Sequence, residues 1–533
     1  RKSAATRTAS PAARKSAATR TASPAARKSA ATRTASPAAR KRSPGPREPA
    51  ARAQAGPGRR YHLDSSFKKL TPAERAERGR QIRADVPRSS HADFAPAPGR
   101  PDPVSILMGQ SETRLPDLVP IRYGRMLASP FSYFRGAALP MAHDLSGTPV
   151  SGLAVQACGD AHLGNFGLFG TAERRLVFDI NDFDETLPGP WEWDVKRLAA
   201  SLEIAARENG IGKRGRTAIV RAAAARYRLA MREFAGQTNL EVFYARADID
   251  DMRHRFAGRL SAGQLSRLEK GVEKARTRDS MQALDKLCRV VDGRPQIVAD
   301  PPIVIPLSSL VPADVDASGV EKLIVRAVDA YKQTLAEDRR YLLDEYRSDV
   351  ADIARKVVGV GSVGTRCWIM LMLGRDSSDP LFLQMKEAGP SVLSEFVGSS
   401  RYEQQGQRVV EGQRLMQATS DVFLGWHRMN PAPDGVVRDF YIRQLRDWKF
   451  SLDTQAMKPS GLSYYGEVCG WTLARAHARS GDRITIAGYL GTSDTFDRAI
   501  AEFSAVYADQ NERDYAALNE AATSGRVLAQ RGV

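Results

Sequence analysis

Apolar positions along the chain alternate between helical spacing and short strand-like runs. Helical spacing recurs at 195–202, 216–290, 320–347, 407–426, 467–478 and 493–522. Strand-like runs lie at 153–155, 176–180, 357–373 and 381–385, with the turn GRDSSDP between the last two. Because a strand-rich region interrupts two helical ones, we expect an α+β fold with two lobes.

This pattern is missing at the N-terminus, where residues 1–39 are three copies of RKSAATRTASPAA. A repeat without a large apolar side chain cannot build a solenoid core, so we predict a disordered basic tail over 1–60. A polar, Pro-rich linker with a short helix opening at Thr71 is expected over 61–101. The body then divides into a mainly helical segment at 102–347, a strand-rich nucleotide lobe at 348–450 and C-terminal helices at 451–533 that complete the helical lobe.

Net charge separates the tail from the body. The formal charge of the chain is +18, but residues 1–60 hold 16 basic residues and one acid, a net +15, which leaves +3 for the rest. A nonspecific nucleic-acid partner is therefore an expectation for the tail alone. Two alternatives stay open: phosphorylation of the repeated RTAS at Ser10, Ser23 and Ser36, or a solvated extension without a dedicated role.

Other features of the composition exclude several classes of protein. No apolar run is long enough for a transmembrane helix, so no membrane partner is expected. The N-terminus has basic residues but no apolar h-region, which argues against a secretory signal. Four cysteines, Cys158, Cys288, Cys367 and Cys469, are scattered without CxxC spacing. We interpret them as reduced thiols of a cytoplasmic protein.

Two clusters of acidic and amide side chains lie at the ends of predicted strands. GDAHLGN contains Asp160 and Asn165, and Asp179, Asp182 and Asp184 end the next strand. Carboxylate and amide oxygens suit Mg²⁺, with phosphate oxygens completing its coordination. In phosphoryl transfer, one Asp accepts the proton of the acceptor hydroxyl while Asn and a second Asp hold the metal. The alternative is that these residues cap turns and helices.

A glycine-rich segment and a lysine mark the strand-rich region. GVGSVG contains Gly359, Gly361, Ser362 and Gly364, and Lys386 lies 22 residues after Gly364. The GxGxxG motif is weak alone. Here, however, strand, glycine loop, strand, turn and Lys-bearing strand follow one another as in a kinase that covers nucleotide phosphates. Alternatively, the glycines serve a bulge or hairpin and the lysine extends to solvent.

These residues carry two resemblances. Asp160-x-x-x-x-Asn165, NDFDE and the later Asp194 look like the HGD-x-x-x-x-N loop, the metal Asp and the helix-opening Asp of aminoglycoside phosphotransferases and choline kinases, although Cys158 replaces the His. More closely, the chain resembles the bacterial domain-of-unknown-function 2252 family over roughly 65–518. The motifs are GDAHLGNFG, FDINDFDET, WEWDVKRLAASL, GVGSVGTRCW, QMKEA, GQRLMQ and LARAHARSGD.

The kinase resemblance implies an ATP- and Mg²⁺-dependent phosphotransferase acting on a hydroxyl of a small molecule or a protein. It assigns Asp160 as the base, Asn165 and Asp182 as metal ligands with Asp179 and Asp184 as further candidates, the glycines of 359–364 as the phosphate cover, and Lys386 as the phosphate clamp with Glu411 or Glu403 as its partner. The catalytic-loop and metal motifs precede the glycine loop here. The resemblance therefore implies a circularly permuted protein-kinase-like fold, cut between the LARAHA helix and the catalytic loop.

Two other function classes remain open. A metal-dependent phosphoesterase would activate water with Asp160, His162, Asp179, Asp182 and Asp184. A non-catalytic pseudokinase scaffold would be tethered to nucleic acid by the basic tail. The kinase interpretation requires the acidic loops and Lys386 to share one cleft.

Overall fold

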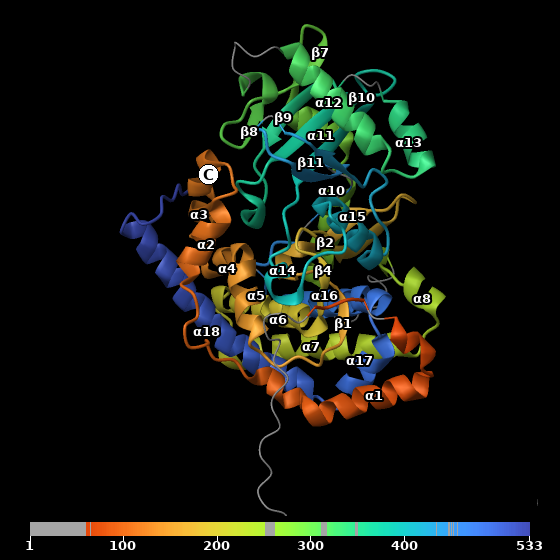
Figure 1. Cartoon of the computed structure of the whole chain (residues 1–533), viewed down its shortest axis with the longest axis vertical. Coiled ribbons are helices and arrows are strands. Elements are labelled where there is room, and N and C mark those ends of the chain that lie inside the picture. The colour runs from red at the N-terminus through yellow and green to blue at the C-terminus, as the bar shows by residue number, and fades with distance from the viewer. Residues whose placement is uncertain are drawn as a thin grey trace, which may run out of the picture. The chain divides into compact units, whose positions relative to one another are not determined.

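The computed structural model describes residues 60–63, 65–250, 262–310, 317–346, 350–432, 434–445, 448, 450, 452–455 and 457–533 (Figure 1). All of them belong to one compact unit, Ala50–Val533, with a mixed α+β fold. Apart from Arg60, the predicted basic tail with Ser10, Ser23 and Ser36 lies outside the described residues.

A six-stranded antiparallel sheet forms the strand-rich region. Its strands, in spatial order, are β12 (Gly425–Met429), β13 (Arg438–Gln444), β11 (Pro380–Glu387), β10 (Cys367–Leu373), β9 (Asp352–Lys356) and β8 (Val304–Pro306). Met370 and Met372 of β10 share an apolar cluster with α12 (Ala317–Lys332) and α13 (Glu337–Asp344). Ile369 and Leu371 pack instead with α11 (Ser280–Leu287). Because alternate residues of a strand point to opposite faces, helices cover the sheet on both sides.

The glycine-rich segment divides the strand predicted over 357–373. β9 ends at Lys356, and pairing resumes only at Cys367 in β10. Gly364 has a φ of +92°, in the left-handed region that favours glycine. The chain therefore leaves the sheet between these strands, whereas the strand predicted at 381–385 is present within β11.

Long helices pack together in the second region. They are α6 (Trp191–Glu208), α7 (Lys213–Ala235), α16 (Pro459–Ser480) and α18 (Thr495–Thr523), and Figure 1 shows α6 and α7 beside α16. Gly470 allows α16 to approach α7 closely, because a Cβ there would lie 2.5 Å from the carbonyl oxygen of Ala223. Leu198 and Leu202, predicted by their helical spacing, are buried in this core.

Two small sheets carry the acidic loops. β1 (Ala154–Ala157) pairs with β4 (Leu187–Pro190), and β3 (Leu176–Ile180) pairs with both β2 (Phe166–Gly170) and β5 (Ala247–Asp248). The strands predicted at 153–155 and 176–180 are thus present. Asp160 and Asn165 lie between β1 and β2, and Asp182 and Asp184 lie between β3 and β4.

Shorter elements complete the fold. The N-terminal helices are α1 (Pro72–Asp85), which Thr71 caps as predicted, α2 (Pro103–Ser111), α3 (Val119–Met126), α4 (Pro130–Gly136) and α5 (Ala138–Ser146). The others are α8 (Asn239–Tyr244), α10 (Ala262–Arg276), the hairpin of β6 (Cys288–Val291) and β7 (Arg294–Ile297), α14 (Ser394–Val397), α15 (Gln405–Met416) and α17 (Arg483–Leu490). In the part of the chain that the structure describes, no helix combines the length and hydrophobicity needed to cross a membrane.

Candidate active site

The acidic loops, the glycine segment and Lys386 line a single cavity of about 360 Å³. This volume lies in the range of small-ligand sites. The lining comes from parts of the chain far apart in sequence: residues between 110 and 138, the loops at 160–165 and 181–185, the segment 356–362, and Gln384, Lys386, Val392, Arg443 and Leu445. Folding therefore brings most of the predicted site residues together.

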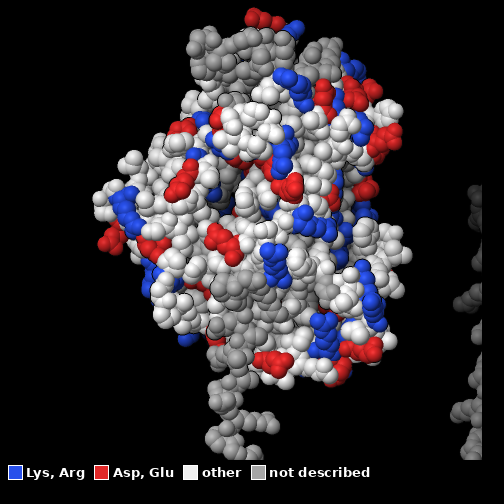
Figure 2. Space-filling model, in the orientation of Figure 1, with Lys and Arg blue, Asp and Glu red and all other residues white. Residues whose placement is uncertain are grey.

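The surface outside the cavity has no comparable concentration of charge on the face that Figure 2 displays. Basic and acidic side chains are interspersed there, without an extended basic area. This distribution agrees with the near-neutral body expected from the sequence. The candidate chemistry therefore lies in the cavity rather than on that face.

A buried carboxylate on α6 holds the backbone of the loop that carries Asp160. Asp194 of α6 accepts hydrogen bonds from the backbone N–H of Cys158 (2.6 Å) and of Gly159 (2.9 Å). Its Oδ2 also lies 3.0 Å from Nε2 of His477 on α16. Asp194 and His477 are thus positioning residues.

Asp160 itself is held by an arginine. Nε of Arg197 on α6 donates to Oδ1 of Asp160 at 2.9 Å. Burial raises the pKa of Asp160 above its usual value, against the opposing effect of Arg197. Such a carboxylate accepts a proton more readily than an exposed one.

His162 faces the other carboxylate oxygen of Asp160. Its Nε2 lies 3.6 Å from Oδ2 of Asp160, and its Nδ1 accepts a hydrogen bond from the N–H of Gly164 at 3.0 Å. Burial, with help from Arg135 and Arg197, lowers the pKa of His162 well below its usual value. His162 is therefore neutral, and its chemistry is that of a hydrogen-bonding neighbour of Asp160.

Asn165 and Asp182 supply the oxygen atoms suited to a metal. Nδ2 of Asn165 donates to the carbonyl oxygen of Asp160 at 2.8 Å, so the amide Oδ1 is the atom that could bind a cation. Burial and the neighbouring Asp184 raise the pKa of Asp182. In the described ranges, no group of three or more His, Cys, Asp or Glu side chains could hold a metal ion. Mg²⁺ at Asn165 and Asp182 would accordingly need water and phosphate oxygens to complete its coordination.

Asp184 acts as the partner of Lys386. The ammonium group forms an ion pair with Oδ2 of Asp184, whose Oδ1 accepts from the hydroxyl of Tyr441 at 2.7 Å. Burial acts to raise the pKa of Asp184, but Lys386 and Tyr441 bring it below its usual value. Burial likewise opposes the charge of Lys386, but Asp182 and Asp184 hold its pKa well above the usual value. Both groups are thus ionised.

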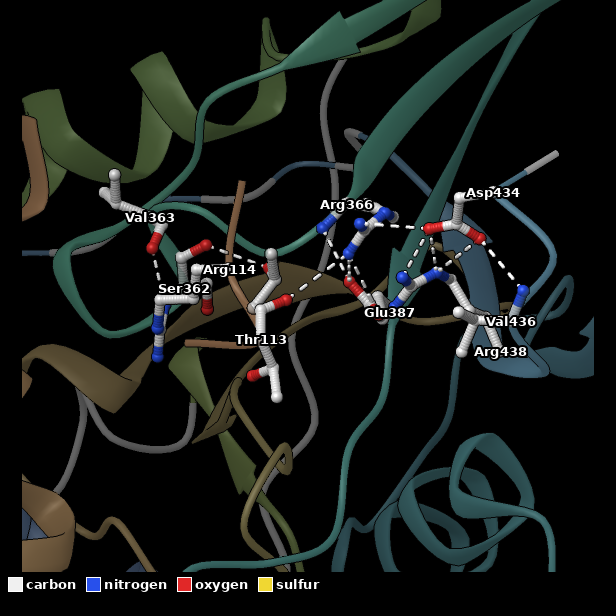
Figure 3. Close-up of polar contacts among 10 residues, drawn as sticks. Thr113, Arg114, Ser362, Val363, Arg366, Glu387, Asp434, Val436 and Arg438 are labelled. Carbon is white, nitrogen blue, oxygen red and sulfur yellow. Dashed lines mark hydrogen bonds and ion pairs between the residues drawn. The ribbon is translucent and has the colours of Figure 1, made fainter. Parts of the chain in front are cut away.

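The glycine segment lies over these groups and is fastened by the N-terminal region. Arg114 donates to the carbonyl oxygens of Gly361 (3.0 Å) and Val363, and Ser362 donates to Asp184 at 3.2 Å. Figure 3 shows Arg114 reaching Val363, while Arg366 reaches Thr113, Glu387 and Asp434. The segment is thereby connected to both sides of the cavity.

Four residues that the sequence assigned to the site do not line the cavity: Asp179, Glu403, Glu411 and Gly364. Asp179 forms a buried ion pair with Arg475 of α16. Glu411 of α15 pairs with Arg414 at 3.1 Å instead of with Lys386. Gly364 contributes its backbone conformation only, because a Cβ there would lie 2.9 Å from Cβ of Arg114.

Several residues of the site escaped the sequence analysis. Arg197 lies one helical turn after Asp194, so helical spacing could have placed both beneath the same loop. Tyr441 pairs directly with Lys386 in the β11–β13 register, and a period of two on β13 adds Arg443. Arg408 of α15, which donates to the carbonyl oxygens of Asp184 and Thr186 at 2.8 Å each, had no local signal.

Comparison with known proteins identifies a family. The family model described as "Uncharacterized protein conserved in bacteria (DUF2252)" matches residues 114–521. No curated protein and no solved structure matches the chain. The matched span includes both acidic loops, the glycine segment, Lys386 and Arg443.

Proposed function

The chain belongs to the DUF2252 family of proteins conserved in bacteria, and within that family we propose that it is an ATP- and Mg²⁺-dependent phosphotransferase acting on a hydroxyl group. The observation that carries this proposal is the ion pair between Lys386 of β11 and Asp184 of the loop after β3. It joins the glycine-loop region to the acidic loops around one cavity, which also contains Asp160.

The predicted residues of the cavity have distinct roles in this proposal. Asp160 accepts the proton of the acceptor hydroxyl, and Arg197 keeps its carboxylate in place. Lys386, oriented by Asp184, binds a phosphate oxygen of the nucleotide, and the glycine segment covers the phosphates. Mg²⁺ bound by Asn165 and Asp182 would neutralise charge on the transferred phosphoryl group.

The contact between the end of α16 and β1 supports a circularly permuted kinase-like fold. In such a fold a helix should lead into the catalytic loop, yet here α16 follows that loop in sequence. The end of α16 nevertheless lies against β1, since the N–H of Gln156 donates to Oγ of Ser480 at 3.0 Å. A Cβ on Gly481 would lie 2.6 Å from a methyl group of Val155. A short link between these two sites would restore the usual kinase order.

A metal-dependent phosphoesterase is less well supported. That function needs several metal-binding side chains around one water, but Asp179 is paired with Arg475 and Asp184 with Lys386. It also leaves the glycine segment and Lys386 without a role. The pseudokinase alternative makes no use of the Asp160–Arg197 arrangement.

Isothermal titration of Mg·ATP into the full chain tests the proposal. Wild type should bind, and Asp182→Ala and Lys386→Met should weaken binding by about tenfold or more. Glu411→Ala is the matched control, because its carboxylate was a candidate but lies outside the cavity lining. Absence of Mg·ATP binding by wild type would refute the phosphotransferase proposal.

A further inference from the structure

The cavity lining carries an excess of positive charge. It includes six basic residues, Arg114, Arg122, Arg135, Lys356, Lys386 and Arg443, and four acidic ones, Asp160, Asp182, Asp184 and Glu185. Three of the arginines come from α3, α4 and the loop between α2 and α3, a region to which the nucleotide and metal assign no role. A cavity with more cations than anions in its lining favours a negatively charged ligand.

Arg122 of α3 is buried without a carboxylate among its hydrogen-bond partners. Arg122 is only 1% exposed to solvent. It donates to four neutral acceptors: Ser111 Oγ (2.9 Å), the carbonyl oxygen of Leu107 (3.1 Å), Oε1 of Gln110 (3.2 Å) and the carbonyl oxygen of Gly136 (3.5 Å). Its Nε has no partner. Burial, with the nearby Arg114, lowers its pKa to about 9. A buried guanidinium group without a carboxylate partner is stabilised when an anion binds to it.

Arg135 of α4 lies beside the loop that carries Asp160, the proposed proton acceptor. Its Nε also has no hydrogen-bond partner and lies 3.4 Å from the position of a Cβ on Gly164, within the Asp160 loop. Burial lowers its pKa, with Asp160 and Asp182 acting in the opposite direction. The side chain is therefore close to the group that would receive the acceptor proton.

Three of the four carboxylates of the cavity are bound to other groups. Asp160 is bonded to Arg197 and Asp184 to Lys386. Glu185 accepts from the N–H of Val392 at 2.7 Å, and burial raises its pKa to about 7. Arg114 is committed to the carbonyl oxygens of the glycine segment. Arg122 and Arg135, in contrast, have no carboxylate among their hydrogen-bond partners, and each keeps a buried Nε without a partner.

We propose that Arg122 and Arg135 form an oxyanion subsite for the acceptor, so that the substrate is a small hydroxyl compound that also carries a phosphate or a carboxylate group. This inference rests on the proposed phosphotransferase function, because Asp160 identifies the acceptor side. The anion would hold the acceptor beside Asp160 while Lys386 engages the nucleotide. Arginine suits this role because its planar donors pair with phosphate or carboxylate oxygens.

Titration calorimetry on the full chain with saturating Mg·ADP tests the subsite with simple probes. Inorganic phosphate and malonate are titrated separately at constant ionic strength. Binding of phosphate indicates a phosphorylated acceptor, and binding of malonate indicates a carboxylated one. Arg135→Gln should weaken binding of the preferred anion by about tenfold or more, as expected for loss of a charge-assisted contact.

Two further variants control for folding. Arg122→Lys keeps the buried charge and should retain more anion binding than Arg135→Gln. Arg479→Gln removes a guanidinium group that is held by the carbonyl oxygens of Leu415 and Phe243 outside the cavity lining, and should leave anion binding unchanged.

The outcomes separate the two proposals. If wild type binds neither anion, or if Arg135→Gln weakens Mg·ATP rather than the anion, the acceptor subsite is wrong while the phosphotransferase proposal stands. If wild type binds an anion in an Arg135-dependent way but binds no Mg·ATP or Mg·ADP, the phosphotransferase proposal fails and only the oxyanion site remains.

Discussion

Lys386 and Asp184 form an ion pair across 202 residues of sequence, between the central strand β11 and the loop after β3. Tyr441 and Ser362 also donate to Asp184, from β13 and from the glycine segment. One carboxylate therefore connects three parts of the strand-rich region to the acidic loops. This environment accounts for why Asp184, rather than Asp182, is the partner of Lys386.

Lys386→Met should destabilise the protein as well as weaken nucleotide binding. Removing the ammonium leaves Asp184 with only two neutral donors, so we expect the free energy of unfolding to fall by about 1–3 kcal/mol. Lys332→Met is the control, since its partner Asp344 is 51% exposed and exposed pairs contribute about 0–1 kcal/mol. Urea denaturation measures both, and equal effects would contradict a special role for the Lys386 pair.

Gly159→Ala should disrupt the loop that carries Asp160. Gly159 has a φ of +84°, and a Cβ there would lie 2.4 Å from the carbonyl oxygen of Glu185. Strain and overpacking should together lower stability by about 2–4 kcal/mol. Gly210→Ala shares a positive φ, +67°, but a Cβ there would meet nothing within 4 Å. It should cost about 1 kcal/mol in thermal denaturation, and a similar loss in both variants would count against steric control of the loop.

Asp194→Ala should release the same loop by a different route. The substitution leaves the buried N–H groups of Cys158 and Gly159 without an acceptor, at a cost of about 1–3 kcal/mol each. Hydrogen exchange of these two amides should accelerate. Asp194→Asn keeps one acceptor oxygen and should lie between wild type and the alanine variant; unchanged exchange in Asp194→Ala would exclude a positioning role.

Lys196 should make stability depend on pH. It is fully buried on α6, where burial lowers its pKa from 10.5 to about 7. The folded chain releases this proton near pH 7, while the unfolded chain keeps it until about 10.5, so stability rises with pH across this window. The slope is at most about 1.4 kcal/mol per pH unit.

The stability advantage of Lys196→Met over wild type should therefore be larger at pH 7 than near pH 10. Urea denaturation at both pH values measures this difference in the free energy of unfolding. Lys213→Met, on the exposed start of α7, is the control and should show no such difference. A stability advantage of Lys196→Met that grows with pH would contradict a lowered pKa for Lys196.

Deletion of residues 1–60 should abolish nonspecific nucleic-acid binding. The segment carries a net +15, and binding through phosphate contacts weakens steeply as salt rises. Fluorescence anisotropy with a labelled duplex, at low and physiological salt, compares the full chain with the truncated one. Equal binding by both would assign the affinity to the body.

Local patterns predicted the strands at 153–155, 176–180 and 381–385 because each is a short apolar run with polar ends. They also placed Asp160, Asn165 and Asp182 at strand ends, where loops present polar groups to a cavity. The strand predicted over 357–373 was wrong in its first half, because apolar residues there are separated by glycines that take the chain out of the sheet.

Pairing between distant residues was not accessible from the sequence. The order of elements in the sequence made Glu411 a reasonable partner for Lys386. In the structure, Glu411 pairs instead with Arg414 on the same helix. Asp179 and Asp184 are similar in local sequence but face Arg475 and Lys386 respectively. Which carboxylate meets which cation depends on tertiary packing, and no helical or strand periodicity encodes that choice.

The contact between Asp194 and His477 also has a consequence for synthesis of the chain. The two residues are separated by 283 positions. At a translation rate of 5–20 residues per second, the Asp160 loop waits roughly 15–60 s after Asp194 is made before His477 exists to hold it. α16, which carries His477, is thus among the last parts to be made. A ribosome-bound fragment ending before α16 therefore carries the acidic loops and Asp194 without the contact to His477.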